Sequence, residues 1–300
     1  MKYNFFNIFI TNHFETEDYY FQCVFDSSKN NIPNSCDTIT HIFETKKFKT
    51  IEKSIFFDGI NDNILKDISL ILTIAQGTHI FCPEQNIGRI SERKKDFNLF
   101  LSDEIGGFLD ESLKHLTKFD KETVGILKIA FLMFYEAKHF LFYDGLRIIL
   151  MMNCFEFLIG SIYRKDEGFY GRELKMQQTF NYIVQKFDYQ KFIGHSLKNK
   201  PIKNKATHNK ISSFNVQFRE MRNWIAHGKQ YQKPVFKNSP SDFEFTFLFR
   251  LESFIRIILI DMIYGKDYKR KVEVLYYIIL ENNVCPTLTP EFAKLKFVNK

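Results

Sequence analysis

The sequence has few cysteines, and their spacing fits neither a disulfide scaffold nor a zinc site. They are scattered, odd in number and contain no C-x-x-C pair: Cys23, Cys36, Cys82, Cys154 and Cys285. Secreted disulfide-rich domains and structural zinc sites both require cysteines at short, regular intervals. We therefore expect reduced thiols in a cytoplasmic protein, with no metal site and no cofactor.

Long uncharged apolar runs are also absent. The most apolar region, residues 124–159, is interrupted by ionisable side chains, among them Glu136, Lys138, Asp144, Arg147 and Glu156. A membrane-spanning helix needs about 20 predominantly apolar residues, so we expect no membrane segment. The first residues, MKYNFFNIFITNHFETED, lack a small-residue cleavage site and run into acidic residues, which argues against a signal peptide.

Acidic residues are outnumbered by basic ones, 35 to 42, which gives a formal net charge of +7. This moderate excess is compatible with a polyanionic partner such as RNA but does not require one. A length of 300 residues with 45% hydrophobic content provides for a sizeable core, in one large domain or two smaller ones.

Residues 1–118 have the pattern of a small α+β module. Short runs rich in Phe, Ile, Tyr and Val at 4–11, 19–25 and 41–57 predict strands, because turn-forming residues separate them. A helix is predicted over 62–76, with Asp62 as N-cap and Gly77 as C-terminal stop. Residues 78–83 predict a further short strand. We expect this module to serve sensing or recognition.

Residues 119–300 change to a helical period. Apolar residues at three- and four-residue spacing predict helices near 120–140, 142–164, 172–187, 211–227 and 242–264. The basic stretch 198–210 predicts a loop that either lines an RNA path or is simply solvated. The expected fold is therefore α+β, with a C-terminal bundle of four to five helices.

The helix predicted at 211–227 carries polar residues apart from its apolar stripe. That stripe consists of Ile211, Phe214, Phe218, Met221 and Ile225. Arg222, Asn223 and His227 lie together on another face, around the small Ala226. Gly228 is a natural stop, so His227 belongs to the last turn, where the helix dipole favours the protonated imidazole.

An arginine beside a titratable histidine suits phosphodiester chemistry. The guanidinium can hold a phosphate and offset charge in the transition state, and the imidazole can transfer a proton near neutral pH. Such a pair can support attack by an RNA 2′-hydroxyl without a metal ion. A two-fold dimer would bring two copies together. The R-x4-H spacing by itself is weak evidence, because a polar helix face is usually just solvated, as in a helical adaptor without activity.

The full string RNWIAHG, residues 222–228, resembles the R-N-x-x-x-H form of the motif of the HEPN superfamily of helical ribonucleases. Residues 147–163, RIILMMNCFEFLIGSIY, resemble the long early helix of that fold, with Glu156 at a position often acidic. Residues 65–81, LKDISLILTIAQGTHIF, are similar to the segment that precedes the HEPN domain in Apea-like, abortive-infection-type proteins.

The resemblance implies a metal-independent endoribonuclease that acts as a homodimer in phage defence or a toxin–antitoxin system. Its partners would be RNA and an antitoxin or a phage-derived trigger protein. Arg222 and His227 would be catalytic, and Asn223 would orient or support them. Glu156 would contact the catalytic side chains rather than the substrate. We expect Arg219 and Lys229 to contact the substrate.

Lys229 stands where HEPN toxins silenced by a nucleotidyltransferase antitoxin have tyrosine, so the resemblance does not extend to that control mechanism. A HEPN-type module that binds RNA or a protein without cleaving is the alternative function.

Overall fold

The computed structural model describes residues 2–8, 13–24, 39–46, 52–59, 63–82, 104–139 and 144–167, and most of 248–263. The chain divides into two compact units. The first comprises Met1–Leu150 with Met262–Gly265, and the second Met151–Asp261 with Lys266–Lys300. The predicted division into 1–118 and 119–300 stays a prediction.

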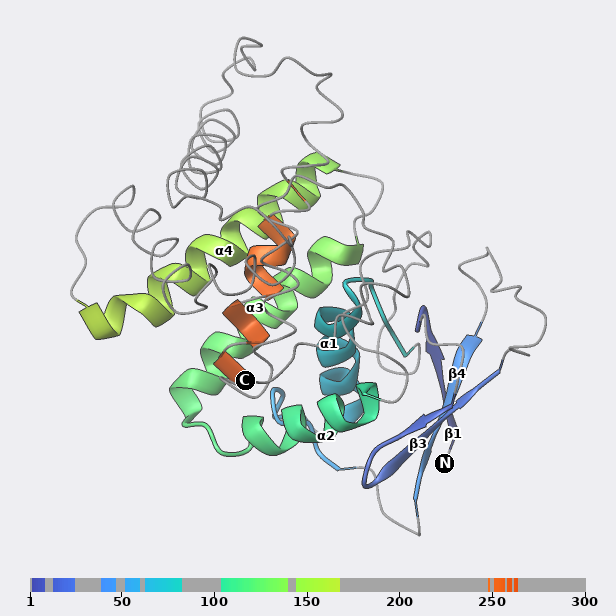
Figure 1. The fold of residues 1–300 in the computed structure, drawn as a ribbon. Coiled ribbons are helices and arrows are strands. Elements are labelled where there is room, and N and C mark those ends of the chain that lie inside the picture. Colours follow the sequence, from blue (N-terminus) through green and yellow to red (C-terminus); the bar gives the residue numbers. More distant parts are fainter. Residues whose placement is uncertain are drawn as a thin grey trace, which may run out of the picture. The chain divides into compact units, whose positions relative to one another are not determined.

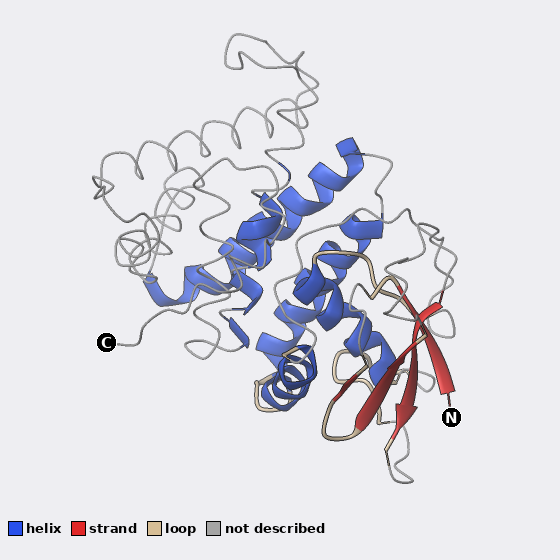
Figure 2. Cartoon of the chain, turned by 45° about the vertical axis from the view of Figure 1, so that its right-hand side comes forward, coloured by secondary structure: helices blue, strands red, loops and turns tan. Residues whose placement is uncertain are grey.

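The described part of the first unit opens with a four-stranded antiparallel sheet. Its strands are β1 (Lys2–Phe6), β2 (Phe14–Glu15), β3 (Tyr19–Cys23) and β4 (Ile39–Thr45), in the order β1-β4-β3-β2. Figure 2 shows them as one twisted sheet. The strands predicted at 4–11, 19–25 and 41–57 are confirmed in part, since each run holds a shorter strand; β2 was not predicted.

One face of the sheet is an aromatic core. The register aligns one row across all four strands: Tyr3, Phe43, Phe21 and Phe14. Adjacent rings in this row lie 4.4–6.1 Å apart between centroids. Burying each phenylalanine contributes roughly 1.5–3 kcal/mol. The opposite face carries polar side chains, including an ion pair between Lys2 and Glu44 at 2.7 Å. The alternation fixes the register, because a slip of one residue would turn the aromatic row to the polar face.

Helix α1 (Ile64–Gln76) is buried along almost its whole length and packs against α2 (Ile105–Leu116) and α3 (Lys121–His139). Figure 1 shows α1 beside α3, with α2 below it. The buried hydroxyl groups of α1 form hydrogen bonds within the helix: Ser69 Oγ donates to Leu65 O at 2.9 Å and Thr73 Oγ1 donates to Ser69 O at 2.7 Å.

The ends of α1 test the predicted caps. Gly77 is confirmed as the C-terminal stop, with a left-handed backbone (φ 70°) and its N–H donating to Thr73 O at 2.8 Å. The predicted N-cap, Asp62, was wrong: Asn63 caps the helix by accepting from Leu65 N at 3.0 Å. The strand predicted at 78–83 is reduced, in residues 78–82, to an isolated bridge between Phe81 and Phe6.

Helix α2 was not predicted. It packs against β2, and Gly106 in its first turn lies directly against the backbone of Glu15. A Cβ at position 106 would overlap the Glu15 carbonyl oxygen, so the close contact of α2 and β2 depends on glycine there.

The helices predicted at 120–140 and 142–164 are confirmed as α3 (Lys121–His139) and α4 (Asp144–Glu167). The helix predicted at 242–264 is confirmed where residues are described, at 248, 251–256, 258–260 and 262–263. In the second unit, Phe155 of α4 contacts Phe254 of this last helix, with 6.0 Å between ring centroids.

The helices predicted at 172–187 and 211–227 lie outside the described residues. The described residues form both helices and an antiparallel sheet, so this part of the chain is mixed α/β, as predicted. None of the helices in the described ranges is long and apolar enough to cross a membrane.

Candidate functional site

The residues of the predicted catalytic motif lie outside the described part of the chain. This applies to Arg222, Asn223 and His227, and to the expected substrate contacts Arg219 and Lys229. Glu156 is described: it lies on α4, half-buried, directly after the fully buried Cys154 and Phe155. Its predicted support of the catalytic pair stays a prediction.

The helix described within residues 248–263 contains charged residues that the sequence reasoning missed. Glu252 is 3% exposed and Arg256 is 1% exposed, one helical turn apart in an otherwise apolar segment. Burying a charge is costly unless it is paired and hydrogen-bonded, so such residues hold defined positions in a core. The signal was present in the sequence as LESFIRIILI, where two ionisable residues interrupt an apolar run.

A second group of titratable side chains gathers in the first unit around His79. This residue follows the end of α1, and its ring lies 4.3 Å from that of Tyr135 and 4.7 Å from that of His139, between centroids. Both partners belong to the last turns of α3. Phe81 stacks on the same ring at 5.5 Å. The contact between His79 and His139 is tertiary, so no local pattern indicated it.

The imidazole of His79 is buried, with 1% of the residue exposed. Neither ring nitrogen has a hydrogen-bond partner among the described residues. Burial lowers the pKa of His79 to about 3, with further lowering by the neighbouring charges of His139 and Lys138. His79 is thus a neutral imidazole at any physiological pH, and it cannot serve as a proton carrier near pH 7 in this position.

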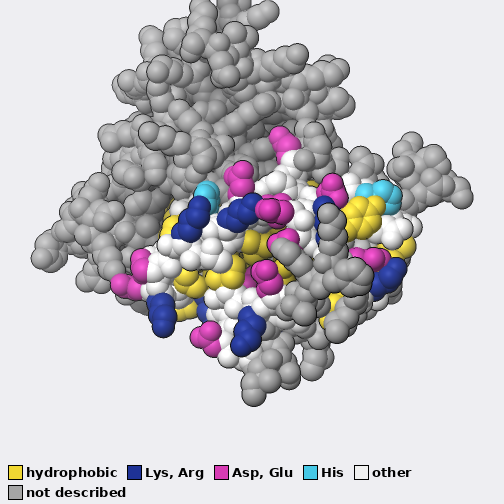
Figure 3. All heavy atoms as spheres, turned by 90° about the horizontal axis from the view of Figure 1, so that it is seen from below, with side chains coloured by type: hydrophobic (Ala, Val, Ile, Leu, Met, Phe, Trp, Pro, Cys, Tyr) yellow, Lys and Arg dark blue, Asp and Glu magenta, His cyan; other side chains and the backbone are white. Residues whose placement is uncertain are grey.

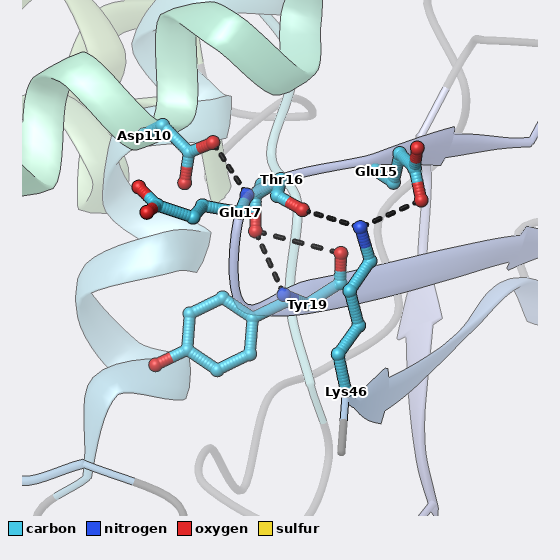
Figure 4. Close-up of polar contacts among 6 residues, drawn as sticks. All are labelled: Glu15, Thr16, Glu17, Tyr19, Lys46 and Asp110. Atoms are coloured by element: carbon cyan, nitrogen blue, oxygen red, sulfur yellow. Dashed lines mark hydrogen bonds and ion pairs between the residues drawn. The ribbon is translucent and has the colours of Figure 1, made fainter. Parts of the chain in front are cut away.

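A third polar group joins the β2–β3 hairpin to α2 (Figure 4). Glu17 N donates to Asp110 Oδ2 at 2.6 Å, and the Lys114 ammonium pairs with Glu17 at the same distance. Lys46 Nζ lies 2.6 Å from Glu15 Oε2 and donates to Thr16 O at 2.7 Å.

The electrostatics of this junction indicate a structural role. Burial raises the pKa of Asp110, although the hydrogen bond from Glu17 N opposes that change. Burial also raises the pKa of Tyr19 well above its usual value, assisted by the nearby Glu52 carboxylate. Asp110 accepts from Glu17 N, and Glu17 in turn pairs with Lys114, so the junction fixes the hairpin to α2.

Within the described ranges, no three His, Cys, Asp or Glu side chains are grouped so that they could hold a metal ion. Figure 3 shows Lys, Arg, Asp and Glu side chains interspersed on one face of the first unit, with apolar surface between them. That face offers no continuous basic path of the kind that tracks a phosphate backbone.

The chain matches no family model, no curated protein and no solved structure.

Proposed function

We propose that the protein is a metal-independent endoribonuclease of the HEPN type, active as a homodimer, with Arg222 and His227 in the catalytic site. The observation that carries the proposal is the string RNWIAHG at residues 222–228, in which arginine, asparagine, a small residue, histidine and glycine occur together. The helices predicted upstream of it at 120–140 and 142–164 are present as α3 and α4, which supports a helical setting for the motif.

The reaction assigned to this site is an internal transesterification. The RNA 2′-oxygen attacks the adjacent phosphorus while its proton passes to a base, and the bond from phosphorus to the 5′-oxygen breaks. The leaving oxygen takes up a proton, so the products are a 2′,3′-cyclic phosphate and a 5′-hydroxyl. His227 moves the proton, Arg222 stabilises the charge on the phosphoryl oxygens, and Asn223 orients the pair.

The remaining assignments place substrate contacts around this pair. Arg219 falls on the predicted polar face, and Lys229 follows directly after Gly228 in the sequence, so we assign both to contacts with the phosphate backbone outside the scissile bond. The half-buried side chain of Glu156 can accept a hydrogen bond from an arginine or a histidine. Phage defence or a toxin–antitoxin system is the biological setting we propose.

The test is RNA cleavage by the purified full chain in excess EDTA. Arg222→Ala and His227→Ala should each lower the cleavage rate by about 100-fold or more, the usual contribution of one such group. His195→Ala and Arg172→Ala, which change the same residue types outside the motif, should cleave at the wild-type rate. Activity that survives either motif substitution would refute the site. RNA binding without cleavage would favour the non-catalytic HEPN-type module instead.

A further inference from the structure

The segment Thr78–Cys82 ties three parts of the first unit together. Three hydrogen bonds hold it to α1 and to the end of β1: Ile80 N to Thr73 Oγ1 at 3.1 Å, Phe6 N to Phe81 O at 3.0 Å, and Asn7 Nδ2 to His79 O at 2.9 Å. The rings of His79 and Phe81 hold it to the end of α3 and to β1. The His79 ring makes the contacts with α3 and the His79 carbonyl accepts from Asn7, so a displacement of His79 would disturb both of these attachments and strain the neighbouring bond from Ile80 to α1.

His79 occupies its position only as a neutral ring. Its two nitrogens are buried without a hydrogen-bond partner among the described residues, so an added proton would have no acceptor there. The titratable groups beside the ring are Tyr135, Lys138 and His139, all from α3, and the last two disfavour a positive charge on it. From the end of β1, the uncharged amide of Asn7 donates to the backbone carbonyl of His79. A second positive charge beside Lys138 would be repelled and poorly solvated.

We propose that the segment Thr78–Cys82 is an acid-sensitive latch, in which protonation of the buried His79 releases the segment from α1, α3 and the end of β1. This inference concerns the first unit and does not depend on RNA cleavage.

The direction of the pH effect follows from proton linkage. The pKa of His79 is about 3 in the closed state, whereas a released, solvated His79 returns to its ordinary value of 6.5. The open state therefore binds more protons than the closed state at every pH between these values. The closed state is fully stable above about pH 6.5, and the opening equilibrium rises about tenfold for each pH unit below it.

The experiment is hydrogen–deuterium exchange of the full chain between pH 7.5 and 4.5, with rates corrected for the intrinsic pH dependence of exchange. Peptides covering residues 77–82 and 2–8 should show an opening equilibrium that rises about tenfold per pH unit below 6.5. A peptide from α2, in the same unit, should not. In His79→Phe, which keeps an aromatic ring but cannot be protonated, the rise should disappear. His139→Gln, which retains His79, should keep it.

Three results would overturn the latch. One is pH-independent opening of residues 77–82 in the wild type. Another is an equal rise in the α2 peptide, which would mean general acid unfolding. The third is the same rise in His79→Phe. If that variant fails to fold, NMR titration of the wild-type histidines decides instead. The latch requires at least one of the eight imidazoles to stay neutral from pH 8 to 5 in the folded chain, and ordinary titration of all eight contradicts it.

Discussion

At the scale of single residues, the buried carboxylate of Asp67 shows how one side chain positions a loop. Asp67 lies on α1 with 0% exposure, and it accepts hydrogen bonds from Ser54 Oγ at 2.6 Å and from Ile55 N at 2.5 Å. The loop 52–59 is thereby attached to the helix. Hydrogen bonds to a charged group contribute about 1.5–3 kcal/mol, and a buried donor left without its acceptor is costly.

We predict that Asp67→Ala lowers the free energy of unfolding by about 2–3 kcal/mol, because it leaves the buried Ser54 hydroxyl and the partly buried Ile55 N–H without an acceptor. Ser54→Ala removes one of these donors and also the acceptor of Phe57 N, but it keeps the carboxylate bonded to Ile55 N, so its cost should be smaller, about 1 kcal/mol. Urea denaturation followed by circular dichroism measures both. A loss in Asp67→Ala no larger than that in Ser54→Ala would show that the carboxylate does not hold the loop.

The residue scale also shows where sequence reasoning succeeds. Gly77 was predictable because a left-handed C-cap nearly requires glycine, whereas two adjacent candidates, Asp62 and Asn63, are equally good N-caps by residue type. The meeting of His79 and His139 was not predictable, since it depends on how α1 and α3 pack. The residues next to each histidine in the sequence contain no pattern that indicates this contact.

At the scale of elements, α2 and β2 meet through a glycine. Gly106 and Gly107 are neighbours in the first turn of α2, but only Gly106 lies against Glu15; a Cβ at Gly107 would have open space around it. The pair is a matched test of that contact, because both substitutions remove the same backbone freedom from the unfolded chain.

We predict that Gly106→Ala destabilises the chain by about 1–3 kcal/mol, since the methyl group forces α2 and β2 apart. Gly107→Ala should be neutral or stabilising by up to about 1 kcal/mol, because alanine is the better helix former. Thermal and urea unfolding of the two variants give the comparison. Equal stabilities would mean that α2 and β2 do not pack as closely as described.

Gly106 and Gly107 also explain why α2 was not predicted from the sequence. Ile105, Phe108, Leu109, Ser112 and Leu116 have the spacing of one buried helical face, and all are buried. Two consecutive glycines at the start lower helix propensity by about 1 kcal/mol each, and this masked the pattern. By contrast, α1, α3 and α4 contain long apolar periodicity, and the strands β1, β3 and β4 follow aromatic runs, so these elements were predictable.

At the scale of the whole molecule, the mixed α/β character was predictable from the change of hydrophobic period along the chain. The proposed catalytic residues, Arg222 and His227, remain a prediction from the sequence, because they lie outside the described residues. Only Glu156 of the proposed site has a described position, half-buried on α4. Spacing alone cannot bring an arginine and a histidine to one phosphate; folding and dimerisation must do so.

We predict that the purified protein is a dimer, with twice the 35.8 kDa mass of the chain by light scattering. A composite site also makes activity depend on protein concentration, since dilution below the dimer dissociation constant separates the two halves. A monomeric mass together with a cleavage rate per chain that does not change on dilution would contradict the composite site.

The central claim is RNA cleavage by 2′-hydroxyl attack, and the chemistry of the new RNA ends tests it most directly. Wild-type protein is incubated in EDTA with an RNA and with the same RNA carrying 2′-deoxy substitutions at its cleavage sites, and the fragments are analysed by mass spectrometry. We predict 2′,3′-cyclic phosphate and 5′-hydroxyl ends from the first substrate and no cleavage at the substituted positions of the second. Ends with 3′-hydroxyl and 5′-phosphate groups, cleavage at a 2′-deoxy position, or intact RNA under all conditions would contradict the claim.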